Sequence, residues 1–311
     1  MKKISVILLS AALMIGITSC GTVRESSGTP AADTVDVEEQ NAKEDNISEE
    51  DLTDEAKTEE IIDFPETVIV DNEEVTFIIE SIDADNMWGY TLKVYLENKT
   101  DKDLMFAMEN ASVNGYMCDP FWASTVNAGM KDNTDISFKA DDFEKYHISD
   151  VTDIEFKLRV YDANDWTADN VVNEIYTIYP SGEDAYATYI REPESTDVVL
   201  YDDENCAVTI TSIEPDNMWG YTINVYLENK TDQNLMYAIE SSSVNGYMSN
   251  PLWATEVAAG KKEISNISWS SSDFEANGIT DVENITMQFR VYDADNISTA
   301  YFVDETFEIT P

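Results

Sequence analysis

Apolar residues alternate with polar ones through most of the chain from about residue 64 onward, and this two-residue period predicts β-strands. In residues 90–97, every second side chain from Tyr90 onward is apolar, and residues 154–161 repeat the pattern from Ile154 onward. Each strand should therefore turn one face toward a core and the other toward solvent. Further strands are expected at residues 67–71, 75–82, 104–113, 116–118, 134–138 and 172–179.

Short turn signals separate the predicted strands. Asn114-Gly115 lies between two of them, and this dipeptide favours the type I′ turn of a β-hairpin. A single helical turn is expected near residues 141–144. About seven or eight short strands with one polar face each indicate an antiparallel β-sandwich.

The strand pattern occurs twice along the chain. Residues 81–180 align without a gap with residues 212–311, and 52 of these 100 positions are identical. The clearest shared run, Asp85 to Thr91, reappears as Asp216 to Thr222. A unit of this length is domain-sized rather than a solenoid repeat, so we expect two independent hydrophobic cores.

The pattern of the first twenty residues indicates an export signal. Lys2 and Lys3 precede an apolar stretch at residues 4–17, which is too short for a comfortable transmembrane helix. The stretch ends in Ile17-Thr18-Ser19-Cys20-Gly21, which resembles the lipobox of bacterial lipoproteins. That resemblance implies cleavage before Cys20 and a diacylglycerol on its sulfur. The alternative is an ordinary secretory signal in which Cys20 is incidental.

The segment that follows is strongly acidic. Residues 21–63 hold 15 acidic and 3 basic residues and no aromatic residue. Such a composition cannot bury enough apolar surface to offset the entropy of the chain. We therefore predict a disordered tether that holds the folded part away from a membrane.

The strand that ends in Val94 to Asp101, followed by a hairpin, resembles the immunoglobulin-like domains of unknown function in surface lipoproteins of Gram-positive bacteria. The resemblance implies a telokin-like immunoglobulin fold and carries no catalytic residues over. We thus expect an all-β protein with two tandem antiparallel immunoglobulin-like β-sandwich domains. The expected segments are a lipoprotein signal peptide at 1–19, a disordered acidic tether at 20–63, a first repeat at 64–180, a linker at 181–195 and a second repeat at 196–311.

Composition excludes several functions. The 311 residues include 63 acidic and 18 basic ones, for a net charge of −45, which argues against a nucleic-acid partner. One His and three Cys leave little material for a zinc site or a His-based triad. We predict no catalytic residue, no metal ligand and no cofactor. Pairs of carboxylates arise by chance among so many acids, so a glycoside hydrolase is disfavoured.

The outward side chains of two strands suggest a binding face. In an immunoglobulin-like topology the strands at 90–97 and 154–161 would be neighbours, and their outward Tyr and Arg residues would form one stripe. Tyr and Arg often dominate binding energy, although cross-strand stabilisation of a solvent-facing sheet is the simpler explanation. The candidate residues in the two repeats are Tyr95, Arg159, Tyr161, Tyr226, Arg290 and Tyr292.

Two further features have simple structural interpretations. Trp88 and Trp219 lie in phase with the inward residues of the following strand, so we expect them to pack in the core. Asp-rich segments at residues 83–86, 162–165 and 293–296 contain oxygen donors suited to Ca²⁺. Asp and Asn also favour turns, and we prefer that interpretation.

These features together predict a lipid-anchored, extracytoplasmic, non-catalytic binding or display protein. Its expected partners are the membrane, through the anchor, and a surface protein or glycan. The alternatives are a structural spacer at the cell surface and a carbohydrate-binding module that uses exposed aromatic residues.

Overall fold

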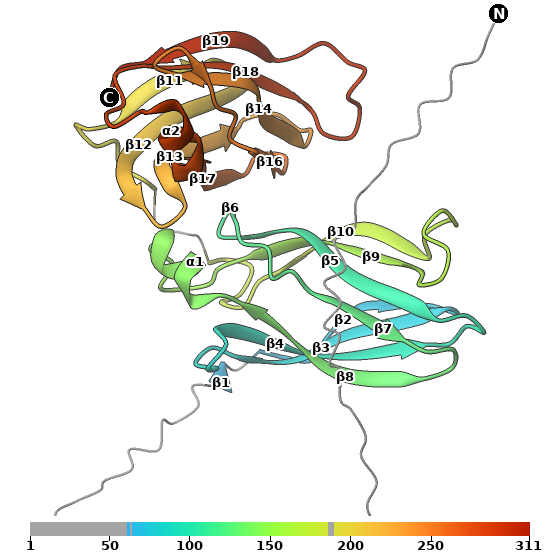
Figure 1. Ribbon diagram of the computed structural model, residues 1–311. Helices are drawn as coiled ribbons and strands as arrows, with labels where there is room; N and C mark the ends of the chain where they lie inside the picture. Colours follow the sequence, from blue (N-terminus) through green and yellow to red (C-terminus); the bar gives the residue numbers. More distant parts are fainter. Residues whose placement is uncertain (1–60, 63, 186–189) are drawn as a thin grey trace, which may run out of the picture. The chain divides into compact units, whose positions relative to one another are not determined.

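The computed structural model describes residues 61–62, 64–185 and 190–311 (Figure 1). The predicted signal peptide and Cys20 lie outside the described residues, as does the predicted tether except for Ile61 and Ile62. Within the described ranges, no helix is both long and apolar enough to cross a membrane.

The first repeat forms two antiparallel sheets. One has the order β1-β3-β4-β8 with β2 beside β3, and the other has the order β10-β9-β5-β6 with β7 beside β5. Figure 1 shows them as two layers. The elements are β1 (Ile61–Ile62), β2 (Thr67–Asp71), β3 (Val75–Asp83), β4 (Tyr90–Asn98), β5 (Leu104–Val113), β6 (Tyr116–Met117), β7 (Ala123–Val126), β8 (Lys131–Phe138), α1 (Ala140–Lys145), β9 (Ile154–Asp162) and β10 (Val172–Ile178). Strand β1 lies inside the segment predicted to be tether. These two residues form a strand because they pair with the end of β3.

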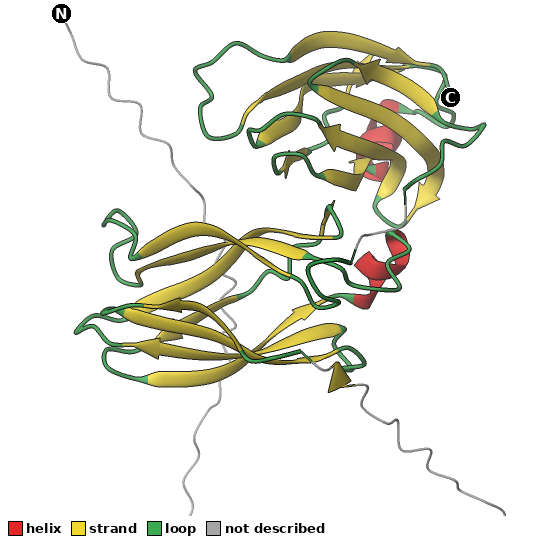
Figure 2. Cartoon of the chain, turned by 180° about the vertical axis from the view of Figure 1, so that it is seen from behind, coloured by secondary structure: helices red, strands yellow, loops and turns green. Residues whose placement is uncertain are grey.

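The second repeat follows the same plan (Figure 2). Its sheets have the orders β17-β13-β12-β11 and β15-β14-β18-β19, with β16 beside β14. A single parallel pair, Tyr116 with Lys262, connects β6 to β17. The elements are β11 (Val198–Asp202), β12 (Cys206–Asn217), β13 (Gly220–Asn229), β14 (Leu235–Val244), β15 (Tyr247–Met248), β16 (Ala254–Val257), β17 (Lys262–Trp269), α2 (Ser271–Asn277), β18 (Ile285–Asp293) and β19 (Val303–Ile309).

Alternate residues of the facing sheets fill the cores. In the first repeat Phe77, Leu92 and Leu96 from one sheet and Phe156 and Leu158 from the other are completely buried. The second repeat has its own buried cluster. The predicted all-β sandwich is therefore confirmed, and the two-residue period correctly identified the inward faces of β4 and β9.

The hairpin between β5 and β6 has the predicted turn. Asn114 and Gly115 both have a positive φ, of 52° and 82°, between the paired residues Val113 and Tyr116. Left-handed conformations at both central positions are what a type I′ turn requires.

A buried asparagine is the last residue of β4 and bonds to backbone groups of neighbouring segments. Asn98 is fully buried, and its amide nitrogen donates to the carbonyl oxygens of Lys102 at 2.7 Å and Val126 at 2.8 Å. Its side-chain oxygen accepts from the backbone N–H of Thr100 at 3.0 Å. Asn229 makes the equivalent bonds in the second repeat. The Asn-Lys-Thr-Asp run shared by the repeats thus has a structural role: its Asn side chain ties the end of the strand to nearby backbone groups. A buried amide must have its hydrogen bonds satisfied.

A glycine directly before β4 allows the chain to pass close to the end of β8. Gly89 has a φ of 110°, and a Cβ at this position would collide with the carbonyl oxygen of Phe138. Gly220 meets the carbonyl oxygen of Trp269 in the same way. No residue with a side chain fits this approach, so the turn before β4 and β13 requires glycine.

We expect Gly89→Ala to lower the free energy of unfolding by more than about 3 kcal/mol, since it adds both a steric collision and a strained φ. Gly129→Ala is the control, because its φ is 67° but a Cβ there meets nothing within 4 Å. That variant should lose only about 1–2 kcal/mol. Denaturant unfolding of the full chain measures both, and equal losses would contradict the packing argument.

Candidate functional site

The predicted Tyr-Arg face does not form as one surface. Strand β4, which carries Tyr95, pairs with β3 and β8, whereas β9, which carries Arg159 and Tyr161, pairs with β5 and β10. The two strands belong to opposite sheets, so their outward side chains point away from each other. Strands β13 and β18 are separated in the same way. The expectation that these strands are neighbours was wrong, because sequence periodicity identifies a strand's faces but not its sheet.

The half-buried Arg159 is held within its own sheet. Its guanidinium carbon lies 4.3 Å from the centre of the Tyr161 ring. One guanidinium nitrogen lies 3.4 Å from a Glu109 carboxylate oxygen on β5, and Nε donates to Asn170 at 3.1 Å. These contacts match the cross-strand stabilisation described above.

Arg290 occupies the equivalent position on β18 and keeps the equivalent partner, Glu240 for Glu109, while its other contacts differ. Its Nε donates to Asp304 at 3.0 Å on β19, and another guanidinium nitrogen lies 3.1 Å from Glu240 on β14. The guanidinium also lies over the ring of Tyr301, 4.7 Å from its centre, and Tyr301 contacts Tyr292 edge to face. Hydrogen bonds from Arg290 and Gln288 lower the pKa of Asp304.

The remaining members of the candidate face are also engaged. The Tyr95 hydroxyl donates to Glu97 at 3.1 Å. Tyr226 is half-buried, and the guanidinium carbon of Arg191 lies 5.4 Å from its ring centre. Burial raises the pKa of Tyr226. The six candidate residues are therefore built into local contacts rather than assembled into a shared site.

The expectation that Trp88 and Trp219 pack in the core was wrong. They are 70% and 72% exposed. The chain reverses just before β4, where Asn86 accepts from the backbone N–H groups of Trp88 at 3.0 Å and Gly89 at 2.9 Å. The two-residue period of β4 therefore starts at Tyr90 and does not extend back through the turn.

The same turn in both repeats presents a Met next to the exposed Trp. Met87 is 83% exposed and Met218 is 85% exposed. We call residues 85–89 and 216–220 the Met–Trp turns. Large apolar side chains exposed together favour contact with a partner, and glycine at the end of each turn holds them outward.

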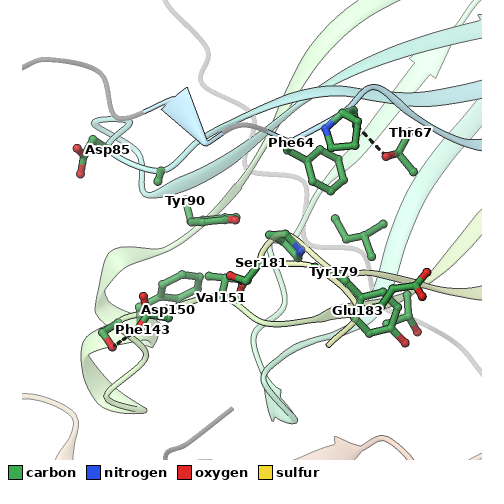
Figure 3. A pocket seen from close by; sticks show the side chains of 17 residues that line it. Phe64, Thr67, Asp85, Tyr90, Phe143, Asp150, Val151, Tyr179, Ser181 and Glu183 are labelled. Carbon is green, nitrogen blue, oxygen red and sulfur yellow. Dashed lines mark hydrogen bonds between the residues drawn. The ribbon is translucent and has the colours of Figure 1, made fainter. Parts of the chain in front are cut away.

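A pocket of about 970 Å³ opens at the same end of the first repeat (Figure 3). It is lined by segments far apart in sequence: Phe64, Pro65 and Thr67, Ala84 and Asp85, Tyr90 of β4, Phe143 of α1, Ser149 to Val151, and Thr177 to Glu183. The sequence analysis missed this pocket, because its wall is assembled from six segments that only the fold brings together.

Tyr90 lies in the lining of this pocket (Figure 3). Only 6% of Tyr90 is exposed, and its ring centre lies 5.6 Å from that of Phe143. Its hydroxyl is buried and has no hydrogen-bond partner among the residues that the structure describes. Burial raises the pKa of this hydroxyl.

The Asp-rich segments adopt turns. Asp162 accepts from the backbone N–H of Asn164 at 2.9 Å, and Asp293 accepts from that of Asp295 at 2.9 Å. Lys102 lies 3.0 Å from the Asp162 carboxylate. Within the described part of the chain, no three His, Cys, Asp or Glu side chains come together in a metal-binding group. The turn interpretation accounts for these contacts.

Comparisons with known proteins add little. No protein-family model matches the chain, and no curated protein matches it. One solved structure that resembles it is the crystal structure of the YadV chaperone, at 10% identity and a TM-score of 0.21. That match covers 70% of this chain and 92% of the other. A likeness at this TM-score carries no inference about function.

The contacts of Arg290 predict an acid-range effect. Because the pKa of Asp304 is lowered in the folded protein, its contribution to stability is present above the unfolded pKa and is lost as pH falls through the folded value. Arg290→Gln should therefore raise the titration midpoint of Asp304 in carboxyl-detected NMR. Arg159→Gln, the matched change in the first repeat, should leave that midpoint unchanged. An Asp304 titration midpoint that is the same in both variants as in the unmodified chain would rule out the ion pair.

Proposed function

We propose that this is a lipid-anchored, extracytoplasmic, non-catalytic binding protein that contacts its partner through the Met–Trp turns of two immunoglobulin-like domains. The observation that carries the proposal is the exposure of Trp88 and Trp219 on turns of identical sequence. A single exposed aromatic residue is common on protein surfaces, but the same exposed pair at the same structural position in both repeats supports a shared role.

The geometry of the turns supports a preformed contact site. Asn86 and Gly89 restrict the first turn by hydrogen bonds and close packing, and Asn217 and Gly220 restrict the second. A rigid aromatic contact loses little conformational entropy on binding. Two copies in one chain would also raise the apparent affinity for a repetitive ligand, since the second contact forms intramolecularly.

The charge of the chain disfavours an anionic partner. At a net charge of −45 the surface repels anionic polymers at long range. Trp rings next to Asp and Asn side chains offer an apolar face with hydrogen-bonding groups beside it, which suits a neutral glycan. A carbohydrate-binding role is therefore the favoured form of the binding function, and a structural spacer is the alternative.

The lipid anchor is the part of the proposal that the leader sequence supports. The expected modification site is Cys20, which follows Ile17-Thr18-Ser19. Two or more acyl chains hold a protein stably in a bilayer, since each buried methylene contributes about 0.8 kcal/mol.

Cys20→Ala should abolish labelling by a fatty-acid probe in cells and release the protein from the membrane fraction. Cys118→Ala is the control, because Cys118 is buried in the first core and should not be lipidated. Labelling and membrane retention that survive Cys20→Ala would overturn the anchor.

The Trp88→Ala/Trp219→Ala double variant should weaken binding to neutral oligosaccharides on a glycan array by at least about tenfold, as expected for loss of aromatic hot spots. Each single variant should retain part of the binding. Trp166→Ala is the matched control, because Trp166 is 77% exposed but its counterpart in the second repeat is Ile297.

Binding that is equally strong in the double variant would place the ligand contact elsewhere. Failure of the unmodified chain to bind either glycans or envelope proteins in a pull-down would favour the spacer.

A further inference from the structure

The pocket of the first repeat has the size and shape of a small-molecule site. Its volume of about 970 Å³ lies at the upper end of the range for ligand pockets. It is distinct from the candidate residues on β4, β9, β13 and β18, and the exposed side chains of the Met–Trp turns do not line it except at Asp85.

Aromatic and proline side chains form most of the apolar wall. Phe64 and Pro65 come from the segment before β2, Phe143 from α1, and Tyr179 and Pro180 from the segment directly after β10. Figure 3 shows Phe64, Tyr90 and Val151 around one space. Flat rings on several sides favour a ligand with a flat apolar body, or a cation held over a ring face.

The polar groups of the lining are mostly satisfied within the protein. Ser181 donates to the carbonyl oxygen of Val151 at 2.7 Å, Thr67 to that of Pro65 at 2.8 Å, and Ser149 to the Asp150 carboxylate at 3.1 Å. The Tyr90 hydroxyl is the exception, since it has no partner in the described part of the chain. A buried hydroxyl without a partner costs free energy, and a ligand that supplies the missing bond recovers it.

The charged groups that line the pocket favour a cationic ligand over an anionic one. The described lining contains the carboxylates of Asp85, Asp150 and Glu183 and no Lys, Arg or His. An anionic ligand would meet only like charges there, whereas an ammonium group is attracted by the acidic rim and can donate an N–H to the Tyr90 oxygen.

The second repeat lacks much of this wall. Tyr221 and Phe274 correspond to Tyr90 and Phe143, and their rings lie 6.1 Å apart. The counterparts of Phe64, Pro65 and Tyr179 are Ser195, Thr196 and Thr310, none of which is aromatic or proline. The two repeats thus share the buried Tyr but not the aromatic wall of the pocket. Tyr221 is therefore a suitable control for Tyr90.

We propose that this pocket binds a small organic amine, a compact apolar body with a primary ammonium group that donates a hydrogen bond to the Tyr90 hydroxyl. This binding activity is separate from the Met–Trp turns, so either proposal can fail without the other.

Three probes with the same phenyl ring and two-carbon chain test the charge preference: phenethylamine, 2-phenylethanol and 3-phenylpropionate. Saturation-transfer NMR on the full chain at pH 7 should give saturable binding of phenethylamine, weaker binding of the alcohol, and at least about tenfold weaker binding of the carboxylate. Any other order of the three probes, or no saturable binding of the amine, overturns the proposal.

Tyr90→Phe removes only the hydroxyl. It should weaken phenethylamine binding about ten- to a hundredfold, as expected for loss of a hydrogen bond to a charged group. The melting temperature should not fall, because the removed hydroxyl has no partner in the described structure. Tyr221→Phe should leave amine binding unchanged. Equal affinities for Tyr90→Phe and the unmodified chain would overturn the assignment of the hydroxyl.

A second variant separates charge from shape. Asp85→Asn/Glu183→Gln retains the volumes of two exposed rim residues and removes their charges. It should weaken phenethylamine binding and leave 2-phenylethanol binding unchanged. Loss of both would mean that the rim shapes the pocket rather than selecting an ammonium group.

Discussion

The close approach of the Gly89 backbone to the carbonyl of Phe138 determines what one end of the first repeat presents to its surroundings. Because a side chain is excluded at this position, the chain can reverse tightly against the end of β8. Residues before the glycine then project outward, and Tyr90 immediately after it turns into the core. The exposed Trp88 and the buried Tyr90 are thus two consequences of one steric constraint, and Gly220 repeats it in the second repeat.

Duplication preserved the features that a sandwich needs and changed those at its end. Buried Asn98 and Asn229 make the same hydrogen bonds, and the inward faces of the strands are apolar in both copies. These interactions are costly to change, because each buried amide or core side chain has specific partners. The segments around Phe64 and Tyr179 carry no such constraint and differ between the copies, so the aromatic pocket wall of the first repeat is not repeated in the second.

The acidic surface and the few basic residues act together. Arg159 is held by one carboxylate and Arg290 by two, each beside an aromatic ring of its own repeat, so these two cations stabilise sheets rather than form a basic binding site. An apolar turn or an aromatic pocket is the type of contact that remains effective on such a surface, since neither depends on attracting an anion. The two proposed sites therefore use different chemistry but follow from the same charge balance.

The sequence by itself determined the strands, their inward faces, the Asn114-Gly115 turn and the duplication, because each depends on neighbouring residues or on a fixed period. It could not assign β4 and β9 to their sheets, since a two-residue period says nothing about which strands pair. Extending that period through the turn misplaced Trp88, although Asn86 and Gly89 were turn signals in the sequence itself. The pocket was decided only by the tertiary structure, because Phe64, Tyr90, Phe143 and Ser181 become neighbours only when the two sheets pack.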